Sequence, residues 1–229
     1  MNSELPKVLH PLFGKPLIKH VIEHLKGAGI DDIIVVVGYM GESVINAVGS
    51  SVEYVWQHEQ LGTGHAVMQA EKTLEGFQGS VVLACGDVPL IRSVTFQRLI
   101  MESKKVGIKS SVLTMKLDNP TGYGRIVTDQ NDNFIRIVEE KDTTLKEKRI
   151  NEVNTGTYVF DKVLLFSGLE TINIKNAQGE YYLPDALEYI RLSGGKVRKV
   201  LLEDSIEGSG INSKDDLQNL ENYYKKTKL

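Results

Sequence analysis

One acidic residue in this 229-residue sequence directly follows a run typical of a buried strand. Gly86-Asp87 comes after the apolar segment 80–84 and before Pro89. In open α/β sheets, ligands bind beyond the carboxyl ends of the strands, so a carboxylate at this position would face the ligand crevice. There it could bind a hard cation such as Mg²⁺, but an Asp that only starts a turn before a proline would give the same pattern. The motif alone favours neither interpretation.

A polar loop with two glycines provides a second candidate. Gln57 is followed by Leu61-Gly62-Thr63-Gly64, just ahead of an apolar pattern with helical spacing. Glycines let a ligand approach the backbone closely, and the Gln and Thr side chains carry the donors and acceptors that a pyrimidine edge requires. Any loop before a helix can contain Gly and Thr, however, and for this motif alone that ordinary interpretation is the stronger one.

Several other polar residues have weaker patterns. The turn 122–125, which contains Gly124, could bring a backbone amide to a sugar or simply close a hairpin. Glu139 and Asn154 lie at the ends of apolar strand segments and could bind sugar hydroxyls, although strand ends at a surface are usually polar. Lys7 is a lone cation, and Asn212 precedes a capped helix. Taken singly, each residue also fits a structural role.

The composition excludes several classes of protein. The net charge is −3, from 27 basic and 30 acidic residues, and the basic residues are scattered, which argues against nucleic acid as the main partner. The single cysteine, Cys85, excludes an internal disulfide and suits a reducing compartment. The five histidines lack metal-ligand spacing. Because no apolar stretch has the length of a signal peptide or a membrane span, we expect a cytoplasmic protein with no membrane partner.

The first half of the chain alternates between strand-like and helix-like patterns. This alternation predicts an α/β fold with a Rossmann-like, mostly parallel sheet flanked by helices. The strands are expected at 31–37, 52–56, 80–84 and 111–117. The helices are expected at 17–25, 41–48, 66–74 and 94–106.

After Pro120 the pattern changes to short strands, which predicts a smaller antiparallel extension that holds a second part of the site. We expect strands at 125–128, 134–139 and 157–160, a helix at 184–192, an alternation at 197–202 and a C-terminal helix at 213–225. Residues 1–229 are thus expected to form a single domain. Its nucleotide-binding part covers about 1–117, and its sugar-binding part with the C-terminal helix covers about 118–229.

The order of the motifs is far more specific than any one of them. Together they resemble the N-terminal uridylyltransferase domain of the bacterial bifunctional N-acetylglucosamine-1-phosphate uridylyltransferase and glucosamine-1-phosphate acetyltransferase, over nearly the whole chain. The segments that carry the likeness are LPKVLHPL with GKP near the start, QLGTGHA at 60–66, GDVPL at 86–90, PTGYGRI at 120–126, VE at 138–139, NTG at 154–156, NAQGEYY at 176–182 and GIN at 210–212.

The resemblance implies Mg²⁺-dependent transfer of a uridylyl group from UTP to N-acetylglucosamine 1-phosphate, which yields UDP-N-acetylglucosamine and pyrophosphate. It also assigns roles to residues. Those matched to the family site are Asp87 and Asn212 as metal ligands, Lys7 and Asp87 as catalytic residues with Lys7 as a phosphate contact, Gln57, Gly62 and Thr63 on the uridine side, Gly124, Glu139 and Asn154 on the sugar side, and Cys85 and Gly86 as further substrate-binding residues.

Three departures from the family pattern affect these expectations. The glycine-rich Leu-x-x-Gly-x-Gly-Thr-Arg-Met opening is matched only at its final residue, which aligns with Met1, so we expect little activity from the chain as given. Cys85 replaces an aromatic residue that often precedes Gly-Asp. The β-helix acetyltransferase domain has no counterpart, so we expect a monomer.

Two other functions fit the same residues. The chain could be another sugar-1-phosphate nucleotidyltransferase that uses dTTP or CTP, because the residues near Gln57 do not by themselves distinguish uracil from thymine. It could also be a sugar-nucleotide binding protein without catalysis, since the glycine-rich opening would hold the triphosphate.

Overall fold

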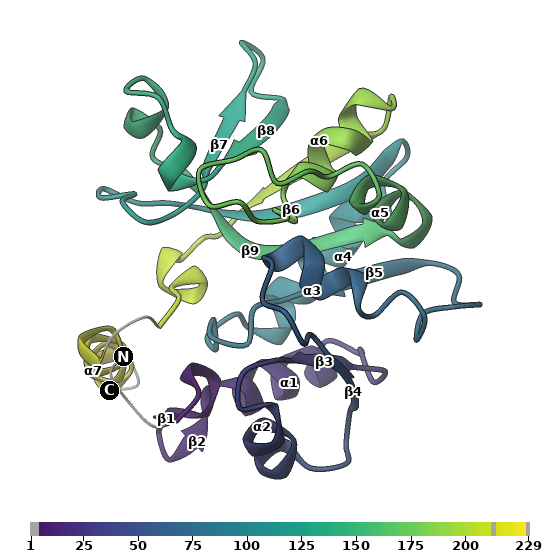
Figure 1. Cartoon of the computed structure of the whole chain (residues 1–229). Helices are drawn as coiled ribbons and strands as arrows, with labels where there is room; N and C mark the ends of the chain where they lie inside the picture. The colour runs from purple at the N-terminus through teal and green to yellow at the C-terminus, as the bar shows by residue number, and fades with distance from the viewer. Residues whose placement is uncertain (1–4, 212–213, 228–229) are drawn as a thin grey trace.

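A computed structural model describes residues 5–211 and 214–227, and its N-terminal part contains the predicted alternation of helices and strands (Figure 1). Helix α1 (Leu17–Gly27) buries the apolar stripe that includes Val21 and Leu25, and the chain then turns at Gly29 with a φ of +87°. The elements that follow are β3 (Ile34–Val37), α2 (Gly41–Val48), β4 (Glu53–Trp56), α3 (Thr63–Met68), β5 (Ser80–Leu83), α4 (Ser93–Ser103) and β6 (Ile108–Lys116).

Short elements precede and follow this part of the chain. Ahead of α1 lie the 3₁₀ turn η1 (Lys7–Leu9) and the short strands β1 (Pro11–Leu12) and β2 (Lys15–Pro16). The second half consists of β7 (Arg125–Thr128), β8 (Phe134–Val138), η2 (Glu140–Asp142), η3 (Glu147–Arg149), β9 (Glu152–Asp161), α5 (Lys162–Leu169), α6 (Asp185–Leu192), β10 (Lys196–Leu201), η4 (Ser205–Gly208) and α7 (Lys214–Thr227). No helix of the described ranges is long and apolar enough to cross a membrane.

The main sheet is mixed and has the strand order β10-β6-β9-β7-β8, with β5 also paired to β9. Strand β10 runs parallel to β6, whereas β9 runs antiparallel to β5, β6 and β7. The expected α/β fold, with helices flanking the sheet and an antiparallel part in the second half, is confirmed. Because β9 comes from the second half but pairs with strands of the first, the predicted nucleotide and sugar parts share one sheet.

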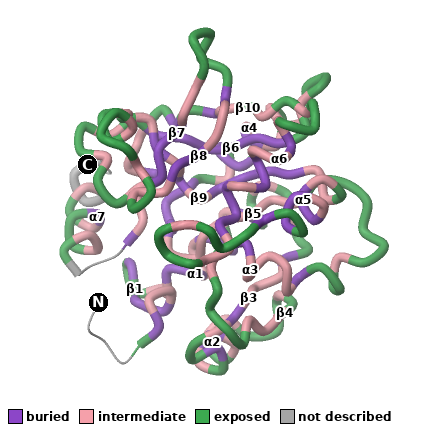
Figure 2. The backbone as a smooth tube through the Cα atoms, turned by 45° about the horizontal axis from the view of Figure 1, so that its top comes forward, coloured by how far each residue is buried: buried purple, intermediate pink, exposed green. Residues whose placement is uncertain are grey.

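The core lies on both faces of this sheet, and Figure 2 shows mostly buried residues along β6 and β9. On one face, α1 and α4 pack against alternate residues of the strands. On the other face, α5 and α6 cover the sheet, with Leu165, Leu187 and Ile190 fully buried. A smaller apolar cluster joins Leu12, Leu17 and Ile211 near the start of the chain.

Several element bounds differ from the expected ones for local reasons. Strand β3 begins at Ile34 because Asp31 and Asp32 are exposed, and α3 ends at Met68 before a series of turns. Strand β9 begins at Glu152, five residues earlier than the apolar pattern indicated. Helix α5 was not expected, because its apolar residues lie on all sides and leave no amphipathic pattern.

Candidate functional site

The phosphate side of the candidate site lies in the loop that follows β5. Lys7, in η1, forms an ion pair with the Oδ2 atom of Asp87, although the two residues are far apart in the sequence. The loop is also held from another direction, because the Ile211 amide donates to the Asp87 carbonyl over 3.0 Å. The structure therefore brings both predicted catalytic residues together at the carboxyl end of a strand, where α/β folds bind ligands.

Asp87 has the chemistry of a hard-cation ligand. Carboxylate oxygens suit Mg²⁺, which often takes one or two carboxylates and completes its shell with substrate phosphates and water. Within residues 5–211 and 214–227, no group of three or more His, Cys, Asp or Glu side chains could hold an ion. Asn212, the second predicted metal ligand, lies outside the described residues.

Cys85 and Gly86 form the tightly packed base of this loop. The Cys85 thiol contacts the Gly156 carbonyl at 3.5 Å. Burial, reinforced by the nearby Asp87 carboxylate, raises the pKa of Cys85 to about 12, so the thiol stays protonated and is no nucleophile at neutral pH. A Cβ added at Gly86 would lie 3.2 Å from Cγ1 of Val8, so Val8 would have to shift by a few tenths of an ångström to make room for it.

The predicted uridine side is a loop whose conformation depends on glycine. Gly62 has a φ of +107°, a conformation that favours glycine. An added Cβ would lie 2.7 Å from the Tyr181 carbonyl oxygen, and only a movement of the backbone could relieve that clash. The Gln57 side-chain amide donates to the Gly62 carbonyl over 3.1 Å, and the Thr63 hydroxyl accepts from the Leu183 amide over 3.1 Å. Gln57, Gly62 and Thr63 are thus gathered in one loop.

The predicted sugar side brings together residues from three strands or strand ends. The backbone N–H of Asn154, in β9, donates to the Gly124 carbonyl over 2.9 Å. Gly124 also packs against the Glu139 carboxylate, because an added Cβ would lie 3.1 Å from its Oε1. The Asn154 side chain donates to the Tyr158 hydroxyl over 2.6 Å and accepts from the Gly156 amide over 3.0 Å. Its orientation is therefore fixed at both ends.

One cavity of about 1600 Å³ connects these three groups. Its lining includes Lys7, Cys85 and Gly86 from the phosphate side, Thr63 from the uridine side, and Glu139 and Asn154 from the sugar side. Such a volume exceeds that of typical small-ligand pockets, about 300 to 1,000 Å³. The cavity therefore has room for a ligand near the three groups and extends beyond them, between β3 and β5.

Glu139 lies in an acidic environment. Burial raises its pKa to about 7, and the carboxylates of Asp185 and Asp142 add to the effect. The pKa of Asp185 is also raised, to about 6, by burial and by Glu188. A protonated Glu139 donates a hydrogen bond and an ionised one accepts it, so near neutral pH this residue can do either toward a hydroxyl group.

The raised pKa of Glu139 predicts a pH-dependent effect on stability. The folded protein binds the Glu139 proton more tightly than the unfolded chain does, because the pKa of this carboxyl is about 7 when folded and 4.5 for an unperturbed group. Ionisation of Glu139 therefore lowers the free energy of unfolding. This loss is absent below about pH 4.5 and complete above about pH 7. We expect Glu139→Gln to leave the free energy of unfolding unchanged near pH ~4 and to raise it by about 1 to 3 kcal/mol near pH ~8. Urea unfolding at the two pH values measures this. An equal change at both would contradict the assigned pKa.

Residues 176–183, for which the sequence predicted no role in the site, connect its uridine side to its sugar side. The Gly64 amide donates to the Tyr181 carbonyl over 2.7 Å, and the Tyr181 amide donates to the Leu61 carbonyl over 2.8 Å. The next residue, Tyr182, donates its hydroxyl proton to Asp142 over 3.1 Å. Residues 176–183 thus join the uridine loop to the acidic side. The motif at 176–182 indicates that this segment belongs near the site, but the sequence does not reveal which residues it contacts.

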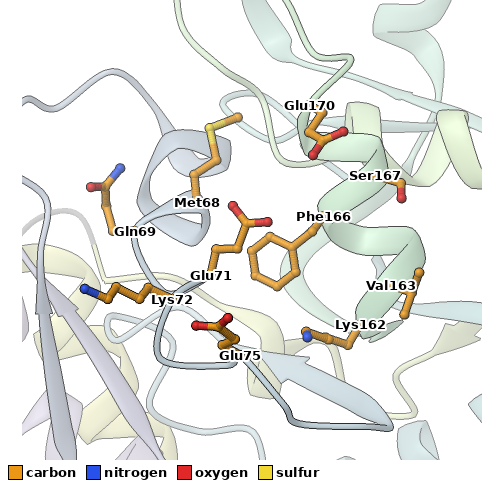
Figure 3. A pocket seen from close by; sticks show the side chains of 10 residues that line it. All are labelled: Met68, Gln69, Glu71, Lys72, Glu75, Lys162, Val163, Phe166, Ser167 and Glu170. Atoms are coloured by element: carbon orange, nitrogen blue, oxygen red, sulfur yellow. The ribbon is translucent and has the colours of Figure 1, made fainter.

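A second hollow, of about 660 Å³, lies on the outside of the fold between the end of α3 and α5. Figure 3 shows Phe166 at its centre, with Glu71 and Lys72 on one wall and Lys162 on the other. The remaining lining residues are Met68, Gln69, Glu75, Val163, Ser167 and Glu170. No predicted site residue lines this hollow, and its charges of both signs do not select a ligand.

Comparison with known proteins defines the class. The nucleotidyl transferase family profile matches residues 2–205, so the chain belongs to that family and is a nucleotidyltransferase. It is 47% identical over 226 residues to the bifunctional protein GlmU of Oceanobacillus iheyensis, covering 99% of this chain and 50% of that protein. GlmU of Exiguobacterium sibiricum is 44% identical over 226 residues, again covering 99% and 50%. The chain thus spans about half the length of these curated relatives.

Solved structures support the fold. The crystal structure of HddC from Yersinia pseudotuberculosis complexed with GMP-PN aligns with a TM-score of 0.68 at 19% identity, covering 98% of this chain and 92% of HddC. A second HddC structure aligns equally well at 18% identity. At this identity the likeness establishes a shared fold and no more.

Proposed function

We propose that this nucleotidyltransferase domain, in a form that also carries the glycine-rich opening, catalyses Mg²⁺-dependent transfer of UMP from UTP to N-acetylglucosamine 1-phosphate, giving UDP-N-acetylglucosamine and pyrophosphate. The observation that carries this proposal is the single cavity lined by Lys7, Thr63, Glu139 and Asn154, with Asp87 paired to Lys7. The names of the curated relatives and the motif series support the choice of substrates.

The chemistry requires charge neutralisation more than acid-base catalysis. A sugar-phosphate oxygen is already an anion and attacks the α-phosphorus in line, while the bond to the departing pyrophosphate breaks. The main obstacle is repulsion between two polyanions. The Lys7 ammonium reduces this repulsion and positions the phosphates, while Asp87 and Asn212 would hold Mg²⁺. When bound, the ion supplies Lewis-acid charge stabilisation to the phosphate oxygens.

The other predicted residues determine which substrates fit. Gln57, Gly62 and Thr63 present amide, backbone and hydroxyl groups to the pyrimidine. Glu139 and Asn154 present hydrogen-bonding groups to the sugar, and Asn154 is held in place by Tyr158 and Gly156. Such preorganisation matters because a site built for a particular hydroxyl group rejects analogues that lack it.

Substitutions on the sugar side should separate the two substrates. We expect Asn154→Ala and Glu139→Ala to raise the KM for N-acetylglucosamine 1-phosphate about 5- to 150-fold, the equivalent of one lost hydrogen bond of about 1 to 3 kcal/mol, and to change the KM for UTP little. Gln57→Ala is the matched control and should act mainly on UTP. Steady-state kinetics measures both constants in a form with the glycine-rich opening. The reverse pattern would mean that the two sides of the site are misassigned.

A competition assay tests the choice of nucleotide. With UTP, dTTP, CTP and ATP present together, the proposal expects UDP-N-acetylglucosamine as the main product. A dTDP- or CDP-sugar as the main product would identify a different nucleotidyltransferase. Tight binding of UDP-N-acetylglucosamine without turnover in any form of the chain would instead support a binding protein.

A further inference from the structure

Glu207 is a buried carboxylate to which the proposed mechanism gives no role. It lies in η4, and only 4% of its surface is exposed. Its Oε2 atom accepts from the Arg92 amide over 3.3 Å and from the Thr95 hydroxyl over 2.7 Å. Its Oε1 atom accepts from the Arg92 Nε over 2.8 Å and pairs with the Arg92 Nη2. Both oxygens are therefore occupied by groups at the start of α4.

These contacts fix the start of α4 to a distant part of the chain. Arg92 directly precedes α4, and the two guanidinium contacts are charge-assisted, which makes them stronger than ordinary hydrogen bonds. A negative charge near a helix N-terminus is also favoured by the helix dipole. In a capping box, a Glu inside the helix accepts from the amide that precedes it. Glu207 accepts that hydrogen bond from 115 residues away.

The start of α4 is also the end of the loop that contains Asp87. Residues 84–92 connect β5 to α4, and we call them the Asp87 loop. Ile211 contacts this loop at two further points. Its amide donates to the Asp87 carbonyl over 3.0 Å, and its fully buried side chain packs in one cluster with Leu90. Glu207 and Ile211 thus hold the Asp87 loop at its end and in its middle.

Residues 205–211, which we call the η4 segment, are in turn fixed to the main sheet. A Cβ added at Gly208 would lie 2.8 Å from the Met115 sulfur in β6 and 2.8 Å from the Thr155 methyl group in β9. The η4 segment is therefore packed against the sheet on one side and bonded to the Asp87 loop on another. The next residue in the sequence is Asn212, the second predicted metal ligand.

We propose that Glu207 is a positioning residue for the metal site. By joining the η4 segment to the start of α4, it sets the spacing between the Asp87 loop and the segment that leads to Asn212. The inference rests on the proposed function, because it concerns how Asp87 is held for its role. Arg92 and Thr95 occupy the Glu207 carboxylate, so Glu207 acts through the loop and not on the phosphates.

Hydrogen exchange resolved to single amides tests this coupling in the metal-free 229-residue chain, without turnover. Glu207→Gln keeps the shape of the side chain but removes its charge. We expect the exchange rate at the Ile211 amide to rise at least about tenfold relative to that at Val159, as the loss of a charge-assisted hydrogen bond implies. Val159 lies in β9 between β5 and β6 and reports on unfolding of the whole sheet. The ratio therefore isolates the local effect.

Steady-state kinetics of the form with the glycine-rich opening tests the consequence for the metal. We expect Glu207→Gln to raise the Mg²⁺ concentration for half-maximal pyrophosphate release at least about fivefold, because the Asp87 carboxylate is no longer held in place. The KM for N-acetylglucosamine 1-phosphate should change little, since Asn154 has its own bonds to Tyr158 and Gly156. A carboxylate that only stabilised α4 would leave the Mg²⁺ dependence unchanged.

Two further variants make the test specific. Glu203→Gln is the matched control, because Glu203 also joins the chain after β10 to α4, through Arg98 in the middle of the helix over 2.9 Å. It should leave both the exchange ratio and the Mg²⁺ dependence unchanged. Thr95→Val removes only the hydroxyl that donates to Glu207. It should shift both readouts in the same direction by less, and it decides the matter if Glu207→Gln does not fold.

An unchanged exchange ratio in the folded Glu207→Gln protein would overturn the proposal, and so would an equal change in Glu203→Gln. An active extended form whose Mg²⁺ dependence is the same with and without Glu207→Gln would also overturn it. If the unsubstituted extended form releases no pyrophosphate, the proposed function fails, and the exchange ratio alone decides whether Glu207 positions the Asp87 loop.

Discussion

Asp87→Ala is expected to lower Mg²⁺-dependent turnover by about 10²- to 10³-fold in a form that carries the glycine-rich opening. Loss of one hard ligand removes several kcal/mol of transition-state stabilisation, and about 1.4 kcal/mol corresponds to a factor of ten. The same change leaves the Lys7 ammonium without its ion-pair partner. Pyrophosphate release at saturating substrates, titrated with Mg²⁺, measures the effect.

Two comparison variants make this result specific. Asp129→Ala removes a carboxylate from an exposed turn and should leave turnover unchanged. Lys7→Ala should lower turnover without changing the Mg²⁺ dependence, because the lysine acts on the phosphates and not as a metal ligand. Near-normal turnover of Asp87→Ala at ordinary Mg²⁺ concentrations would remove this residue from the site.

Local sequence patterns predict the helices that bury one face and the strands that consist of a continuous apolar run. The apolar spacing of α1 and α2 and the β-branched run of β3 lead to these elements with small errors at their ends. Strands β7 and β8 also follow from short apolar segments, and β7 comes directly after the glycine turn at 122–124. In each case the pattern reflects which faces of the element contact the core, because side chains repeat with the period of the helix or strand.

The sheet order could not be predicted in the same way, because it depends on contacts between residues far apart in the chain. Strand β9 comes after β7 and β8 but lies between β5 and β6, and no local pattern encodes that position. Its first residues were missed because Asn154 and Gly156 interrupt the apolar alternation. Gly156 has a φ of +75°, and the register with β6 shifts nearby. Irregularities of this kind often accompany sites.

In the candidate site, too, the residues could be predicted from the sequence but their contacts could not. Its residues were selected through the motif series, and the structure places Lys7 beside Asp87 and Glu139 beside Gly124. Roles for these residues remain predictions. The contacts of Tyr181 and Tyr182 were not predictable, because they join segments about 120 and 40 residues apart through backbone and hydroxyl groups.

Pyrophosphate release from UTP and N-acetylglucosamine 1-phosphate, with Mg²⁺, tests the account most directly. It is measured for this chain and for a form extended upstream by an apolar strand and a Gly-x-Gly-Thr-Arg loop. The loop would supply backbone amides and an arginine to the triphosphate. We predict rapid release by the extended form, and little or none by the 229-residue chain. Comparable turnover of the two, or none by the extended form, would contradict the account.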